Sequence, residues 1–294
     1  MAKNDFLKRL HAGEVLVSDG ATGTNLQRVG LPVGAAAEAW VLDNPEAIQD
    51  LNRAFIQAGA DILLTCTFGA TRRRLAASSL EGQFEAVNRQ AVAITCAVVD
   101  GQDVLVAGSM GPLGHMLAPL GLVTVEEAEA DYRDQAMLLC EGGVDLIVIE
   151  TQYDLIEARA AIRGVRAIAQ DIPLVCSFSY DRGAHTMMGV KPTEMAAEIG
   201  AMEVDVLGIN CGRSLDNNLV ALSQLRAATD KPLWFKPNAG LPEVDADGQP
   251  TYAVTPEQMG ALVPDWITAG AQVVGGCCGT SPEHIAQIAE RVHA

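Results

Sequence analysis

Three cysteines in two glycine-bearing stretches carry the strongest chemical signal in the sequence. Cys277 and Cys278 are adjacent in the hexapeptide Gly-Gly-Cys-Cys-Gly-Thr at residues 275–280, and Cys211 follows an apolar run at residues 204–209. Zinc binds thiolates well and is four-coordinate in proteins. If the three sulfurs converge, they would hold a zinc ion with one position left for a substrate. The alternative is that they are small buried side chains, as we expect for the other cysteines, Cys66, Cys96, Cys140 and Cys176.

Such a site suits the activation of an external thiol. A free alkyl thiol has a pKa near ~8.5, so it is mostly protonated at neutral pH. Coordination to zinc removes the proton, and no general base is needed. The five histidines have no spacing typical of hydrolytic zinc sites. A protein that only stores or carries the metal, without turnover, stays an open alternative.

Eight short apolar runs, separated by amphipathic stretches, set the predicted architecture. We predict strands at residues 15–18, 61–67, 104–107, 145–149, 174–178, 204–209, 233–236 and 272–275. Helices are predicted between them, with start signals such as Thr124 and Glu127, and a long polar loop is predicted at residues 241–252. Continuous apolar strands alternating with helices indicate a parallel sheet covered by helices. Eight units favour a (β/α)8 TIM barrel that forms a single domain over residues 1–294. A doubly wound open sheet is the competitor, but its phosphate-loop patterns are missing.

Polar residues and the three cysteines fall at the carboxyl ends of the predicted strands. They are Asp19, Thr67, Glu150, Asn210, Cys211, Cys277 and Cys278. In (β/α)8 barrels this end forms the active face. The predicted sixth and eighth strands lie two apart around the ring, so the cysteines at their ends could meet.

Composition excludes several function classes. The formal net charge is −17, which argues against binding a phosphate backbone or an anionic membrane. No apolar run approaches the roughly 20 residues that span a bilayer, and we expect no signal peptide. An odd number of cysteines, seven, lies within apolar segments. We therefore expect a cytoplasmic protein with free or metal-bound thiols.

Taken together, these motifs resemble the homocysteine S-methyltransferase family. That family includes betaine–homocysteine methyltransferase, S-methylmethionine-dependent enzymes and the homocysteine-binding module of cobalamin-dependent methionine synthase. The resemblance covers the whole chain in order and rests on five motifs. They are Gly-Gly-Cys-Cys-Gly-Thr at residues 275–280, Asn-Cys-Gly at residues 210–212, Asp-Gly-Ala-Thr-Gly-Thr at residues 19–24, Thr-Phe-Gly at residues 67–69, and Glu-Thr at residues 150–151. It implies a zinc-dependent methyltransferase in which zinc-bound homocysteine thiolate attacks an activated methyl donor and gives methionine.

The resemblance also assigns roles to individual residues. Cys211, Cys277 and Cys278 would be the zinc ligands. The loop at residues 19–24 would offer backbone N–H groups to the homocysteine carboxylate, and Glu150 would pair with the amino group. The residues expected at the substrate are Asp19, Gly20, Ala21, Thr22, Thr67, Glu150 and Asn210. Helix capping, surface ion pairing and hydrogen bonding at the barrel rim are the alternatives for Asp19, Glu150 and Thr67.

The methyl donor is the part that the sequence determines least. Betaine enzymes box a quaternary ammonium with aromatic rings, but only 4% of this chain is aromatic. Gly69 stands where the animal betaine enzymes would have an aromatic residue. Possible donor contacts are Trp40, Tyr153 and Asn238. The motifs resemble the methionine synthase module more closely, which favours a methylcorrinoid (methylcobalamin) presented by a separate protein. Betaine and S-methylmethionine are the alternative donors.

Overall fold

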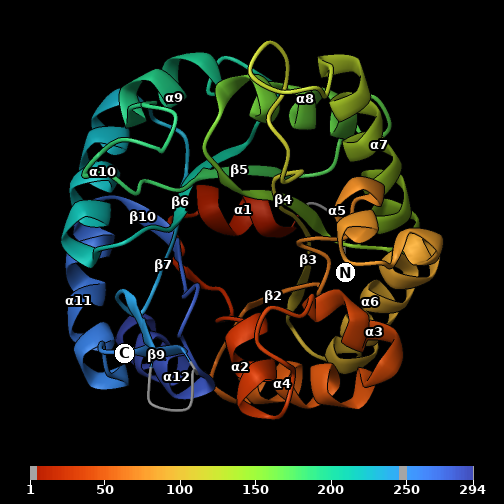
Figure 1. Ribbon diagram of the computed structural model, residues 1–294. Helices are drawn as coiled ribbons and strands as arrows, with labels where there is room; N and C mark the ends of the chain where they lie inside the picture. The colour runs from red at the N-terminus through yellow and green to blue at the C-terminus, as the bar shows by residue number, and fades with distance from the viewer. Residues whose placement is uncertain (1–4, 245–249, 294) are drawn as a thin grey trace.

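The computed structural model describes residues 5–244 and 250–293, and it confirms the predicted barrel (Figure 1). Eight strands form one sheet in which each neighbouring pair is parallel. Around the ring the strands follow the order β1 (Leu16–Val17), β10 (Ala271–Val274), β7 (Leu233–Pro237), β6 (Val206–Cys211), β5 (Leu174–Phe178), β4 (Leu146–Gln152), β3 (Leu105–Met110) and β2 (Ile62–Leu64).

Short contacts between β1 and β2 close the ring. Ser18 pairs with Ile62 in an isolated parallel bridge. The Asp19 N–H donates to the Ile62 carbonyl at 3.0 Å, and the Asp61 N–H donates to the Val17 carbonyl at 2.7 Å. The Asp61 carboxylate also accepts from the Val17 N–H at 2.8 Å. The seam of this nearly closed barrel therefore depends on side chains as well as on the backbone ladder.

Helices cover the outside of the ring, as Figure 1 shows. They are α4 (Pro45–Gln57), α6 (Phe84–Val99), α7 (Val125–Gly142), α8 (Leu155–Arg166), α9 (Pro192–Glu198), α10 (Leu215–Ala228), α11 (Pro256–Thr268) and α12 (Pro282–Val292). Three shorter helices, α2 (Gly23–Arg28), α3 (Trp40–Asp43) and α5 (Arg72–Ala77), lie in the loops after β1 and β2. The predicted start of α7 is confirmed, because Thr124 and Glu127 form a reciprocal capping box. Within the described ranges, no helix has the length and apolar character that crossing a membrane requires.

The inside of the barrel is packed with apolar side chains, and α1 (Asp5–His11) blocks one end of it. Phe6 and Leu10 of this helix join a buried cluster with interior residues of the strands, among them Leu16, Ile62, Leu105, Leu146, Val175, Val206, Trp234 and Val273. In Figure 1, α1 lies across the middle of the ring of strands. This helix is not among the predicted elements, because two apolar residues four apart, Phe6 and Leu10, give a weak signal without their partners.

Two further segments differ from the sequence prediction. The predicted loop at residues 241–252 contains an antiparallel hairpin of β8 (Pro242–Val244) and β9 (Pro250–Tyr252), while residues 245–249 lie outside the described residues. The strand predicted at residues 61–67 ends early, at Leu64. The chain turns there, since the Thr67 N–H donates to the Thr65 carbonyl at 2.8 Å.

Removing the Phe6 ring should destabilise the whole barrel. Phe6 is fully buried in the interior cluster, so Phe6→Ala should lower the free energy of unfolding by about 3–5 kcal/mol. Urea denaturation followed by circular dichroism measures this. Lys8→Ala, on the exposed side of the same helix, is the control and should change stability by less than about 0.5 kcal/mol. If both variants unfold at the wild-type urea concentration, α1 does not plug the barrel.

Candidate metal centre and substrate pocket

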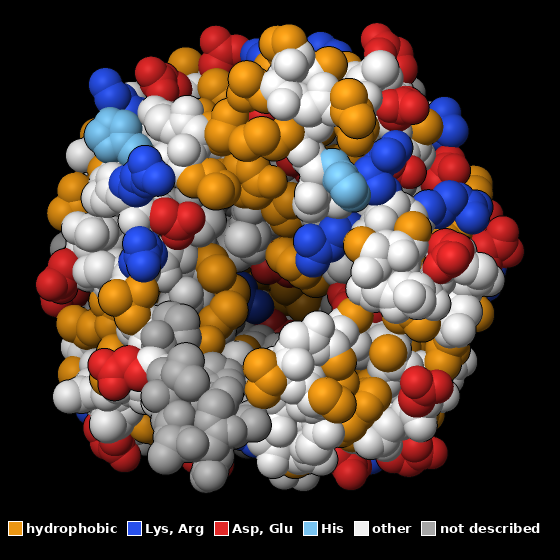
Figure 2. Space-filling model, viewed as in Figure 1, with side chains coloured by type: hydrophobic (Ala, Val, Ile, Leu, Met, Phe, Trp, Pro, Cys, Tyr) orange, Lys and Arg blue, Asp and Glu red, His pale blue; other side chains and the backbone are white. Residues whose placement is uncertain are grey.

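A cavity of about 460 Å³ opens at the carboxyl ends of the strands. The face seen in Figure 2 is hollowed near its centre, and charged side chains of both signs are visible inside. The walls come from the loop after β1, the segment at residues 34–38, and the ends of β2, β3, β4, β6, β7 and the loop after β10. The volume is sufficient for one or two small ligands.

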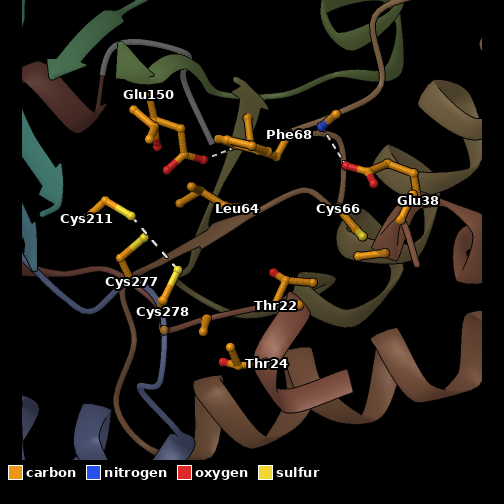
Figure 3. Close-up of a pocket in the computed structure, with 18 of the residues that line it drawn as sticks. Thr22, Thr24, Glu38, Leu64, Cys66, Phe68, Glu150, Cys211, Cys277 and Cys278 are labelled. Atoms are coloured by element: carbon orange, nitrogen blue, oxygen red, sulfur yellow. Dashed lines mark hydrogen bonds between the residues drawn. The ribbon is translucent and has the colours of Figure 1, made fainter. Parts of the chain in front are cut away.

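The three cysteines named from the sequence converge at one side of this cavity (Figure 3). The Sγ atoms of Cys211, Cys277 and Cys278 all lie within 4.8 Å of one another, and those of Cys211 and Cys278 are 3.9 Å apart. Ligand sulfurs about 2.3 Å from a tetrahedral zinc would be separated by about 3.8 Å. Among the described residues, no other Cys, His, Asp or Glu belongs to the cluster. The donor set therefore fits a zinc ion with three protein ligands and an open position.

The thiols also interact with one another. Hydrogen bonds from Cys211 and Cys277 lower the pKa of Cys278, while hydrogen bonding to its two neighbours and burial raise the pKa of Cys211. The cluster thus favours a negative charge on Cys278, which is the form that binds a metal.

Unusual backbone geometry brings the sulfurs together. Cys211, the last residue of β6, has a φ of 61°, which is uncommon for a residue with a side chain. The chain after β10 runs so close to β1 that a Cβ on Gly275 would lie 2.8 Å from the carbonyl oxygen of Ser18 and 2.9 Å from that of Asp19. Only glycine permits this approach, which fixes where the cysteine loop leaves the barrel.

Asn238 holds the two cysteine loops to each other. Its Oδ1 accepts from the Cys278 N–H at 3.0 Å, and its Nδ2 donates to the Gly212 carbonyl at 2.7 Å. Its backbone N–H donates to the Cys211 carbonyl at 3.3 Å. The sequence suggested Asn238 as a donor contact, but Asn238 is not one of the residues that line the cavity. Its contacts instead hold the loops that carry Cys211 and Cys278.

Tyr252 of β9 packs against the loop that carries the adjacent cysteines. A Cβ on Gly279, which has a φ of +82°, would lie 2.2–2.6 Å from atoms of the Tyr252 ring. Burial raises the pKa of Tyr252, and the nearby Cys278 raises it further. This contact was not predicted, because residues 241–252 were expected to form a polar loop.

Asn210 is completely buried behind the metal site and connects it to β4. Its Oδ1 accepts from the Thr151 N–H at 2.8 Å and from the Ser177 hydroxyl at 2.6 Å. Its Nδ2 lies 2.6 Å from the Thr151 Oγ1 and 4.0 Å from the Cys277 Sγ. Thr151 has a φ of 60°, a strained conformation for a β-branched residue, and these bonds hold it there. The strained turn follows directly after Glu150.

Glu150 presents a buried carboxylate to the cavity. Its Oε1 accepts from the Ser109 hydroxyl at 2.5 Å, and its Oε2 lies 3.5 Å from the Asn210 Nδ2. Burial raises the pKa of Glu150 to about 7, although the Lys236 ammonium opposes that rise. A cationic group bound beside Glu150 would favour its ionised form. Thr67, predicted at the substrate, lies behind this site instead and donates to the Ser109 carbonyl at 2.7 Å.

Asp19 and Lys236 form a buried ion pair below the cavity. The Lys236 Nζ lies 2.5 Å from the Asp19 Oδ1, and the side chains are 3% and 2% exposed. The Asp19 Oδ2 accepts from the Leu64 N–H at 2.7 Å. Asp19 does not line the cavity, whereas Lys236 does. Sequence reasoning missed Lys236, although a lysine in the apolar run Leu-Trp-Phe-Lys-Pro was a usable signal.

The loop after β1 has free backbone donors. Gly20, Ala21 and Thr22 all line the cavity, as the resemblance implied. The Ala21 N–H is already bound to the Thr280 carbonyl at 3.2 Å. No described residue accepts from the N–H groups of Gly20, Thr22 or Gly23, which leaves them available to a ligand.

The outer part of the cavity contains a second carboxylate. Glu38 is buried and accepts from the Gly69 N–H at 2.5 Å, and Figure 3 places it beside Phe68, on the opposite side of the cavity from the cysteines. Arg74 also lines the cavity, and its guanidinium lies 5.9 Å from the centre of the Phe68 ring. These three residues line the outer part of the cavity.

Trp40 and Tyr153, suggested from the sequence as donor contacts, lie outside the cavity lining. Trp40 packs against a buried apolar cluster that includes Val41 and Ile48. The Tyr153 carbonyl accepts from the Thr186 hydroxyl at 2.8 Å. Nothing in their position supports contact with a donor.

Comparisons with known proteins agree with this geometry. The sequence model of the family described as homocysteine S-methyltransferase matches residues 16–292. The chain is 31% identical to methionine synthase of Mycobacterium leprae (strain TN) over 98% of its own length and 25% of that protein. It is 30% identical to methionine synthase of Mycobacterium tuberculosis over 95% of its length and 24% of that protein. The chain thus spans about a quarter of these two relatives.

A solved structure gives a match over full length. The metallated form of the homocysteine methyltransferase MmuM from Escherichia coli is 28% identical, with a TM-score of 0.81. The match covers 99% of this chain and 100% of that one.

Gly276→Ala should disrupt the metal centre. A Cβ at this position would lie 2.4 Å from the Thr280 Oγ1 and Cγ2, so the loop that carries both adjacent cysteines must shift. We expect metal affinity to fall at least about tenfold, as it does when support around ligands is lost. Competition with a chromogenic chelator measures the affinity. Gly82→Ala, where a Cβ meets nothing within 4 Å, is the control. Equal affinities in the two variants would contradict the tight packing.

Proposed function

The chain belongs to the homocysteine S-methyltransferase family, and on that premise we propose that it is a zinc-dependent enzyme that methylates the sulfur of homocysteine to give methionine. The observation that carries the proposal is the cluster of three thiols at the edge of a cavity that also contains a buried carboxylate, Glu150. An enzyme needs the open coordination position that this cluster leaves. A storage protein would close it.

Cys211, Cys277 and Cys278 would hold the zinc ion. The ion would supply Lewis acidity that keeps the substrate sulfur deprotonated at neutral pH. The chain's own residues then fix the rest of the substrate. Glu150 would bind the amino group, and the free N–H groups of Thr22 and Gly23 would bind the carboxylate.

Positioning does most of the remaining work. Methyl transfer to a thiolate moves no proton, so no general acid or base is required in that step. Asn210 holds the Glu150 turn beside Cys277, so the group that binds the amine and the group that binds the metal keep a fixed separation. Two reactants held in line in a small cavity gain a large rate advantage over reaction in solution.

For the methyl donor we propose first a methylcorrinoid presented by a separate protein. The support is the similarity to methionine synthases. A small sulfonium or quaternary ammonium donor is the second candidate, and the outer cavity favours it. There Glu38 offers a buried negative charge beside the Phe68 ring, and both attract a cationic methyl donor.

Loss of one thiol should remove the metal and the activity. Cys277→Ala leaves two sulfurs, and we expect less than about a tenth of the wild-type zinc content and no methionine formation. Metal analysis and a methionine assay measure both. Cys66→Ala is the control, since Cys66 lines the same cavity outside the cluster and should keep its zinc. A Cys277→Ala protein with normal zinc and rate would overturn the zinc mechanism.

A donor screen should separate the two donor classes. Methionine formation is followed with a methylcorrinoid protein, S-methylmethionine and betaine, in the wild type and in Glu38→Gln. We expect turnover with the methylcorrinoid protein, unchanged by the substitution. If a cationic donor is used, Glu38→Gln should lower its kcat/KM about tenfold, because a charged contact is lost. Failure of all three donors with homocysteine bound would contradict both donor assignments.

A further inference from the structure

We propose that the Lys236 ammonium binds the α-carboxylate of the thiol substrate, so that the site selects amino-acid thiols over simple thiols. The inference rests on the proposed function, because it places homocysteine at the cysteine cluster. It adds a charged anchor that neither the sequence motifs nor the similarity to known proteins assigned.

Lys236 has hydrogen-bond donors to spare. An ammonium group carries three N–H donors. One is directed to the Asp19 carboxylate at 2.5 Å, and no other described residue accepts from this nitrogen. The face of the Trp234 ring, 5.7 Å from the Nζ, occupies another side. Since Lys236 lines the cavity, the unused donors are available to a bound anion.

The charges around Lys236 suit a zwitterion. Glu150 of β4 and Lys236 of β7 line the same cavity. They are close enough for the Lys236 ammonium to lower the pKa of Glu150, against the effect of burial. An amino-acid headgroup has an ammonium and a carboxylate on one carbon. Glu150 would bind the ammonium group. Lys236 would bind one oxygen of the carboxylate, and the N–H groups of Thr22 and Gly23, which line the same cavity, would bind the other. The sulfur, two methylenes further along, would then reach the cysteines.

A purely structural role is the competing explanation. Lys236 could serve only as the counter-ion of Asp19, which would otherwise be a lone buried charge. The two explanations differ in what they predict for ligands. If Lys236 is only a counter-ion, its loss should weaken the binding of all thiols equally. If it anchors the carboxylate, its loss should weaken the binding only of thiols that carry a carboxylate.

Thiol binding tests this without a methyl donor. Isothermal titration calorimetry on the zinc-loaded protein compares homocysteine with 3-aminopropanethiol, which lacks the carboxylate, and with 4-mercaptobutanoate, which lacks the amine. In Lys236→Met we expect homocysteine and 4-mercaptobutanoate to bind about 10- to 100-fold more weakly. Binding of 3-aminopropanethiol should stay within about twofold of the wild type, since a carboxylate anchor makes no contact with it.

Two further variants keep the test decisive. Lys231→Met is the matched control, because Lys231 lies outside the cavity lining and its Nζ donates to the Val204 carbonyl. If Lys236→Met does not fold, the Asp19→Asn, Lys236→Met double variant removes both charges together. Zinc content is measured for every variant.

Each outcome bears on one claim. An equal loss for all three thiols, or no loss for homocysteine, in a folded and zinc-loaded variant would overturn the anchor and leave the proposed function standing. Failure of the wild-type protein to bind homocysteine at all would overturn the proposed function itself, and the anchor with it.

Discussion

The carboxylate of Asp19 ties together the strands on which the site is built. It binds Lys236 of β7 with one oxygen and the Leu64 N–H of β2 with the other. Between β1 and β7 in the ring lies β10, from which the adjacent cysteines follow. Breaking a buried ion pair by removing one partner typically costs about 3–5 kcal/mol. The contact therefore fixes both the seam of the barrel and the floor of the cavity.

Strain is concentrated around the same site. Cys211 and Thr151 have left-handed backbone conformations, and each costs about 1–3 kcal/mol that ordinary strand ends avoid. Asn238 and Asn210 hold these two turns through several hydrogen bonds each. Two side-chain amides, Asn210 buried and Asn238 partly buried, thus keep the Cys211 sulfur and the Glu150 carboxylate in fixed positions before any ligand arrives.

The barrel and the cysteine cluster were predictable, because both follow from local pattern. Continuous apolar runs indicate buried strands. In a (β/α)8 barrel, the residues that directly follow such a run lie at the active face. The roles of Lys236, Asn238 and Tyr252 were not predictable, since each depends on contacts between distant segments. The same limit applies to α1, because Phe6 and Leu10 can be identified as core residues only when their partners inside the ring are known. Trp40, suggested from the sequence as a donor contact, packs against a buried cluster and does not line the cavity.

The blocked end of the barrel has a kinetic consequence. Because α1 and the apolar interior fill one end of the barrel, the cavity opens at the other end. The cysteines and the Glu38 region lie on opposite sides of one small cavity, so under the proposed function a thiol and a donor would share that opening. Whichever molecule occupies the deeper place must enter first and leave last. Turnover would then follow a compulsory order, and an excess of the late-binding reactant would trap its predecessor inside.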